Sequence, residues 1–515
     1  MIKLKDIKFG KIDGRNEAEL QEFEDLFYNN DGIYEKLLEP DIFIISGRKG
    51  SGKTTLIEYF IKKNNSKANK VFSRKDSYEN FRLNLVMDKQ TLRSDIHNLW
   101  KWTILIELTK LIVSSSLDSN NNNIKKLTNF LKNNQFEMEL GGAKTIEITN
   151  FESNDNSLSA EIGGSANFEF GAKIFAKIKG FLNAKVSTHS KEINSNSHKL
   201  VEGGYLEQIR ALEKIIFDVL EIISKEDKNN FFLIYDELDS FFETSDDYKN
   251  SIKSLVSVIN SLNNDFRKKN INCKIIICLR NDIFRLIENS NTNKLTIDHT
   301  LNLNWHIEGE LSPLIKLIAN KIKASHKEIF VGKDDKEIFY SLFNSNKIKV
   351  GQKNIELHKY FLEKTLHRPR DIVYFFMCFG RNYGDKEKLT KSMINSTEAE
   401  YSSYFFNEVK SELYGHFNQD DVDNCLNILI NFQARSFFTK DLELYIKNNN
   451  SKINEKILSE ILEKMFIFGV LGLERTGNIA NHTRIHWAKN NDNIRFSKNQ
   501  KLHLHKGLLK YFNLV

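Results

Sequence analysis

The chain has 515 residues, of which 40% are hydrophobic and 28% are charged, and this composition excludes collagen-like and wholly disordered proteins. Its length predicts about three domains. The net charge of +7, from 75 basic and 68 acidic side chains, permits acidic or nucleic-acid partners without requiring them.

Membrane and secreted classes are also disfavoured. No apolar run reaches the roughly 18 residues that a membrane span requires, and the first residues lack a secretory signal. The four cysteines form no CxxC pair, which fits a reducing compartment. We therefore expect a cytoplasmic protein with no membrane partner.

A glycine-rich loop follows the first predicted strand. Asp41–Ser46, with four consecutive apolar residues at its centre, predicts a buried strand, and Thr54–Lys62 has a helical pattern. Between them, Gly47–Thr54 fits GxxxxGK[ST], the pattern of a phosphate-binding loop when it joins a strand to a helix. Backbone N–H groups and the positive end of the helix would face the phosphates.

This loop predicts ATP and Mg²⁺ as cofactors. Lys53 is expected to contact the β- and γ-phosphates, and Thr54 is expected to ligate Mg²⁺. The nucleotide-binding residues that the motif predicts are Gly47, Arg48, Lys49, Gly50, Ser51, Gly52, Lys53, Thr54 and Thr55.

An insertion is predicted within the sheet domain. Lys53 and Asp236 are 183 residues apart, whereas two βαβ steps take roughly 60 residues. We place the insertion at about 136–200, where glycines separate alternating segments such as Lys173–Lys179, and we expect β-hairpins there. The insertion is either a solvent-facing ornament or a contact element for a partner or a neighbouring subunit.

A second apolar strand, Asn230–Asp236, ends in two acids. Asp236 is expected to hold Mg²⁺ through water, and Glu237 is expected to orient and deprotonate the attacking water. The alternative is a surface strand end with two ordinary acids. Asp239 would either support these acids or cap the following helix.

A third apolar strand, Lys274–Leu279, is followed by Arg280. An arginine at this position could distinguish ATP from ADP by bonding the terminal phosphate. Apolar strands separated by helical patterns indicate a parallel sheet with crossover helices.

Four segments together resemble bacterial P-loop ATPases related to the STAND and AAA+ groups, of the kind found in antiphage defence loci. These segments are Gly47–Thr54, Asp236–Glu237, Leu279–Phe284 and His367–Asp371. The resemblance implies ATP rather than GTP and a homo-oligomer. Because the C-terminal third carries no second catalytic motif, any effector or regulator would be a separate protein.

The resemblance also implies an arginine that closes on the nucleotide from a helical lid. Arg370 or Arg368 matches that place, and Arg370 is included among the expected nucleotide-binding residues. The alternative is a pair of arginines that fix a helix start by salt bridges. Arg267 and Arg285 are candidates for an arginine that acts on a neighbouring subunit.

The C-terminal third predicts a winged-helix-like domain. Helical patterns at Thr439–Ile446 and Ile453–Phe468 precede two short strands, Gly469–Glu474 and Asn493–Phe496, which would pair as a hairpin. Basic residues that could grip DNA phosphates there are Lys489, Arg495, Lys498, Lys501, Lys506 and Lys510. The alternative is a packing module surrounded by solvated lysines.

We therefore predict an α/β chain in three parts: a P-loop NTPase domain at 1–310 with a parallel sheet and a β-rich insertion, a helical lid at 311–400, and a winged-helix-like domain at 401–515. Its expected function is that of a Mg-dependent ATPase, with Glu237, Lys53 and Arg280 in catalysis, whose nucleotide state drives assembly or a conformational switch. Two rival functions are a DNA-dependent motor or loader, and a scaffold that holds nucleotide with little turnover.

Overall fold

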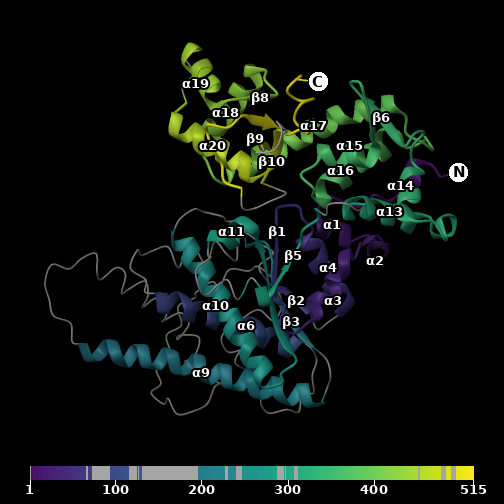
Figure 1. The fold of residues 1–515 in the computed structure, drawn as a ribbon. Helices are drawn as coiled ribbons and strands as arrows, with labels where there is room; N and C mark the ends of the chain where they lie inside the picture. The colour runs from purple at the N-terminus through teal and green to yellow at the C-terminus, as the bar shows by residue number, and fades with distance from the viewer. Residues whose placement is uncertain are drawn as a thin grey trace. The chain divides into compact units, whose positions relative to one another are not determined.

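The computed structural model describes residues 2–64, 68–71, 93–114, 124–125, 127–129, 195–226, 230–238, 246–286, 295, 297–306, 311–449, 453–476, 483–488 and 494–514 (Figure 1). The chain forms two compact units, each built from separate segments. The first comprises Met1–Asp31, Arg48–Thr55 and Leu303–Val515, and we call it the C-terminal unit. The second comprises Gly32–Gly47 and Leu56–Asn302, and we call it the sheet unit.

The sheet unit contains a five-stranded parallel sheet with the order β2-β3-β4-β1-β5. The strands are β1 (Ile44–Gly47), β2 (Ala68–Val71), β3 (Phe231–Tyr235), β4 (Cys273–Arg280) and β5 (Thr300–Asn302). The α/β class and the three strands predicted from apolar runs are confirmed, whereas β2 and β5 were not predicted. Every residue of β3 and β4 is buried, as expected for strands covered on both faces.

Helices cover the two faces of this sheet. The helices in or entering the unit are α3 (Ile33–Leu38), α4 (Lys53–Asn64), α6 (Arg93–Ser114), α9 (Ser195–Glu226), α10 (Asp246–Lys268) and α11 (Asn281–Leu286). On one face, Leu233 and Ile275 pack into a core with α6, α9 and α10. On the other, Phe60 of α4 meets Phe232 edge-to-face at 4.7 Å. The predicted insertion at 136–200 lies outside the described residues, except for the first turns of α9.

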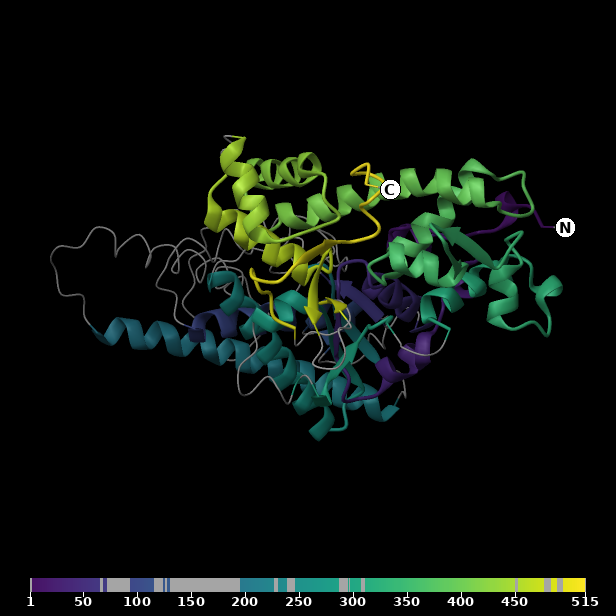
Figure 2. The same ribbon diagram turned by 45° about the horizontal axis from the view of Figure 1, so that its top comes forward.

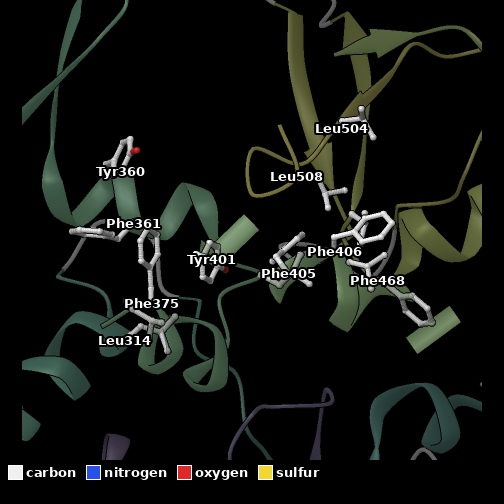
Figure 3. Close-up of a cluster of buried hydrophobic side chains, with 14 of the residues drawn as sticks. Leu314, Tyr360, Phe361, Phe375, Tyr401, Phe405, Phe406, Phe468, Leu504 and Leu508 are labelled. Atoms are coloured by element: carbon white, nitrogen blue, oxygen red, sulfur yellow. The ribbon is translucent and has the colours of Figure 1, made fainter. Parts of the chain in front are cut away.

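Helices dominate the C-terminal unit up to residue 414. They are α1 (Gly14–Ala18), α2 (Phe23–Leu26), α13 (Pro313–Ser325), α14 (Asp335–Tyr340), α15 (Leu357–Lys364), α16 (Pro369–Asn382) and α17 (Lys391–Tyr414), with a hairpin of β6 (Lys347–Val350) and β7 (Lys353–Glu356). Aromatic rings fill the core between α15, α16 and α17, where Phe375 stacks on Tyr401 at 4.4 Å (Figure 3). Helix α17 runs without a break through residues 400 and 401, where we expected a domain boundary.

The N-terminal segment belongs to this same helical core. Leu4, Ile7 and Phe9 are buried with the residues of α13 and α16. The Leu4 N–H donates to the Lys386 carbonyl at 2.8 Å, and the Phe9 ring lies 5.6 Å from Phe376. The first residues therefore pack with segments more than 300 residues away in sequence, an arrangement that we did not predict.

The remainder of the C-terminal unit combines three helices with a small antiparallel sheet of order β10-β9-β11-β8 (Figures 1 and 2). The elements are α18 (Gln419–Phe432), α19 (Thr439–Asn448), α20 (Glu455–Ile467), β8 (Ser436–Phe437), β9 (Leu471–Thr476), β10 (Thr483–Trp487) and β11 (Leu502–Leu504). The two predicted helices correspond to α19 and α20.

The predicted pairing of Gly469–Glu474 with Asn493–Phe496 is wrong. β9 pairs with β10 on one edge and with β11 on the other, so residues 494–496 have no free edge of β9 to join. Instead Phe496 packs its ring against Phe466 of α20 at 6.0 Å.

Candidate functional site

The glycine-rich loop has a backbone that requires glycine at two positions. Gly50 and Gly52 have φ values of 78° and 93°, in the left-handed region that other residues rarely adopt. A Cβ atom at position 50 would also lie 3.1 Å from the Cβ of Arg370. The loop leaves β1 at Gly47 and enters α4 at Lys53, as the sequence predicted.

The start of α4 gives this loop its capacity to bind an anion. The first amide N–H groups of a helix have no partner within the helix, and they attract negative charge. Lys53, the first residue of α4, donates from Nζ to the Arg48 carbonyl at 3.1 Å and so closes the loop on itself. Thr54 and Thr55 follow in the same turn and are half-buried. An ammonium, amide N–H groups and two hydroxyls together suit a phosphate and a hard cation.

Ser51 is a buried residue of the loop. It is 3% exposed, and its Oγ has no hydrogen-bond partner within the described ranges. Its carbonyl accepts a 2.8 Å hydrogen bond from the Trp305 indole N–H. Sequence reasoning missed Trp305, because nothing in the local pattern ties residue 305 to residue 51.

Two arginines at the start of α16 also hold the loop, each in a different way. The backbone N–H of Arg370 donates to the Gly50 carbonyl at 3.3 Å, and the Arg368 guanidinium donates to the Lys49 carbonyl at 3.3 Å. The Arg370 Nη1 atom lies 3.4 Å from a carboxylate oxygen of Glu408. Its Nε is shielded from solvent and has no hydrogen-bond partner among the residues that the structure describes.

Arg368 is fully engaged in ion pairs. It is 3% exposed and contacts Asp371 at 2.9 Å and Glu412 at 3.4 Å. Burial alone would lower its pKa, but the adjacent carboxylates outweigh burial and raise the pKa above the usual arginine value. This geometry matches the alternative in which an arginine fixes a helix start by salt bridges.

Further contacts join the loop to α17 and α20. The Arg48 guanidinium donates to the Ile467 carbonyl at the end of α20, at 3.3 Å. The Lys49 ammonium lies 3.5 Å from the Ser411 hydroxyl of α17. Since 419 residues separate Arg48 from Ile467, no local pattern predicts this contact.

In the sheet unit, three predicted site residues, Gly47, Asp236 and Arg280, lie at the carboxyl ends of neighbouring strands. The parallel register puts Gly47 opposite Arg280, and Asp236 directly follows the neighbouring strand β3. Asp236 is 1% exposed. Glu237 has a φ of 60°, a left-handed conformation that costs about 1–3 kcal/mol and is concentrated at functional sites. Asp239 lies outside the described residues.

Arg280 is held by a neighbour that we did not predict. Its Nε and Nη2 atoms donate to the two carboxylate oxygens of Asp282 at 2.9 Å and 2.7 Å. A second link at this edge joins the Ser46 hydroxyl to the Asn281 side-chain oxygen at 2.7 Å. The bidentate pair fixes the guanidinium direction at the carboxyl end of β4.

Several other candidates have ordinary partners. Arg267 is paired with Asp41, and the Lys506 ammonium lies 2.5 Å from a carboxylate oxygen of Glu363. The side chain of Arg285 and all of Lys489 lie outside the described residues.

One family model matches part of the chain. Residues 312–410 match the FunZ-associated C-terminal helical domain, a region that runs from α13 through most of α17 and includes Arg368 and Arg370. No curated protein matches the chain. None of the described helices is long and apolar enough to cross a membrane.

Proposed function

We propose that this chain is a Mg-dependent ATPase whose nucleotide state drives assembly or a conformational switch, in bacterial defence and together with a separate effector protein. In this proposal the sheet unit and the glycine-rich loop form a P-loop NTPase core, α13–α17 form a lid, and α18–α20 with the small sheet form a winged-helix-like domain. The match to a FunZ-associated domain, a defence-associated family, supports the defence setting.

One observation supports the proposal that nucleotide binding changes the conformation of the chain. Four consecutive loop residues are hydrogen-bonded to the C-terminal helical elements or to the segment that leads into them: Arg48 to Ile467, Lys49 to Arg368, Gly50 to Arg370 and Ser51 to Trp305. A phosphate that draws the loop N–H groups inward would therefore strain or relieve all four bonds. Differential contacts of this kind allow a ligand to shift a conformational equilibrium.

The chemistry follows from the residues at the sheet edge and the loop. Lys53 and the loop N–H groups would bind the β- and γ-phosphates, and Thr54 and Asp236 would hold Mg²⁺, which neutralises phosphate charge when bound. Glu237 would take the proton of the attacking water. Arg280, aimed by Asp282, would bond the terminal phosphate and so distinguish ATP from ADP. ATP rather than GTP rests on the family resemblance.

The topology of the sheet supports this placement. In the strand order, β2, β3 and β4 lie to one side of β1, and β5 lies to the other. The chain therefore changes its direction of travel across the sheet at β1, which is the switch point. Ligands of open parallel sheets bind beyond the carboxyl ends of the strands at such a switch point. Gly47, Asp236 and Arg280 occupy those ends.

The test is ATP hydrolysis by three purified variants compared with the unchanged chain. Lys53→Ala should lower turnover at least about 100-fold by removing the phosphate ligand, and Glu237→Gln should lower it by about 10²–10⁴-fold while ATP stays bound. Lys62→Ala, on the same helix as Lys53, is the matched control and should hydrolyse ATP normally.

Each variant can contradict a different part of the proposal. Wild-type turnover in Glu237→Gln would remove Glu237 as the base. Wild-type turnover in Lys53→Ala would place hydrolysis elsewhere in the chain. Tight nucleotide retention with no turnover in the unchanged chain would favour a nucleotide-holding scaffold instead.

A further inference from the structure

Two arginines face each other across the β9–β10 hairpin. The antiparallel register puts Arg475 directly opposite Arg484. Directly opposed residues share a face of the sheet, with Cβ atoms about 5 Å apart. The same face of β9 carries the fully buried Leu473 two residues earlier, whereas Arg484 is exposed. The hairpin therefore passes from the core into solvent at the arginine pair.

This pairing destabilises the hairpin by itself, because like charges placed directly opposite each other repel. Within the described residues, neither arginine has an ion-pair partner. The Nε of Arg475 is shielded from solvent and has no hydrogen-bond partner in that part of the chain. The adjacent acid cannot compensate, because Glu474 points to the other face and bonds His503 at 2.6 Å. Among the residues that the structure describes, no anion therefore compensates the arginine pair.

Basic residues outnumber acidic residues in the segments that form this hairpin and follow it. Among the described residues of 471–514, Glu474 is the one acidic residue, and the basic residues are Arg475, Arg484, Arg495, Lys498, Lys501, Lys506 and Lys510. The exposed residues of α20 carry both charges, since Glu455, Glu460 and Glu463 lie on the same helix as the exposed Lys456. Glu455 is paired with Lys447, and Glu460 is paired with Lys456. A polyanion would be attracted to the hairpin more strongly than to α20.

We propose that the β9–β10 hairpin binds the phosphate backbone of duplex DNA through Arg475 and Arg484. Guanidinium groups bind phosphate oxygens in a planar, bidentate manner. Two arginines whose Cβ atoms lie about 5 Å apart can hold one phosphate or two adjacent ones. Contacts to phosphate oxygens carry no sequence information, so this binding is independent of sequence. It is a separate property from ATP hydrolysis.

The experiment measures fluorescence anisotropy of the full chain with two unrelated labelled duplexes of about 30 base pairs, without nucleotide, at low and at physiological salt. We expect similar affinities for both sequences. Arg475→Ala with Arg484→Ala should weaken binding about 10- to 100-fold and lower the salt slope by about two. The matched control, Lys440→Ala with Lys447→Ala on α19, makes the same change in net charge and should bind like the unchanged chain.

The single variant Arg484→Glu keeps the test possible if the double variant misfolds, because Arg484 is exposed and its replacement leaves the core intact. It should weaken binding more than Arg484→Ala does. Unchanged DNA affinity in the arginine variants, or no DNA binding by the unchanged chain, overturns the proposal. Loss of self-association in sedimentation, with DNA affinity unchanged, would identify a second copy of the chain as the occupant.

Discussion

Arg368 and Arg370 lie two residues apart and have different surroundings. Arg368 is buried between two carboxylates, while the side chain of Arg370 is 25% exposed and meets one carboxylate at 3.4 Å. Breaking a buried ion pair leaves an uncompensated charge in the interior. Breaking a pair that solvent reaches costs less, because water can solvate the remaining charge. Substitution of Arg368 should therefore mainly lower the stability of the fold, and substitution of Arg370 should mainly change the response to nucleotide.

We predict that Arg368→Ala lowers the free energy of unfolding by about 3–5 kcal/mol, because Asp371 and Glu412 lose their buried partner. Arg370→Ala should lower it by about 1 kcal/mol or less and should instead weaken ATP turnover. Urea unfolding and ATP hydrolysis, measured on both variants, provide the comparison. Equal losses of stability would show that Arg370 is also a structural residue.

At the scale of single elements, β4 contains a buried lysine. Lys274 is 6% exposed, and its ammonium donates to the carbonyls of Leu37, Glu39 and Ile42, where α3 ends and the chain enters β1. Burial lowers its pKa to about 7, because the charged form is desolvated. This side chain links the segment between α3 and β1 to the start of β4.

The lowered pKa predicts a pH dependence. Between pH 7 and the ordinary lysine pKa of 10.5, the unfolded chain binds more protons at this residue than the folded chain. The contribution of Lys274 to the free energy of unfolding should therefore rise with pH in that window, by at most about 1.4 kcal/mol per pH unit. Lys274→Met removes this dependence. Urea unfolding of both proteins across the window tests it, and a constant difference between them would contradict the lowered pKa.

Elements with a strong local pattern were predictable, and the others depend on contacts distant in sequence. Continuous apolar runs identified β1, β3 and β4. The edge strand β2 reads Ala-Asn-Lys-Val, which has no such run, and its identity comes from pairing with β3. In the same way, the GxxxxGK[ST] pattern located the loop, but only the folded chain shows Trp305 against Ser51.

At the scale of the molecule, the C-terminal unit is assembled from three distant segments. The short loop segment Arg48–Thr55 belongs to it together with the N-terminal residues and everything after Leu303. Anything that loosens the core of this unit should consequently disturb the loop. The N-terminal segment offers a test, because it supplies core side chains far from the loop in sequence.

We predict that Phe9→Ala lowers the free energy of unfolding by about 3–5 kcal/mol, since Phe9 is 4% exposed and its removal leaves a cavity beside Phe376. Lys5→Ala, in the same segment, breaks only an exposed ion pair with Asp385 and should leave the free energy of unfolding nearly unchanged. If the unit is cooperative, Phe9→Ala should also weaken nucleotide binding at temperatures near its unfolding midpoint, and Lys5→Ala should not. Thermal unfolding followed with and without ATP measures both effects. Full nucleotide affinity in a destabilised Phe9→Ala protein would show that the loop is positioned independently of the helical core.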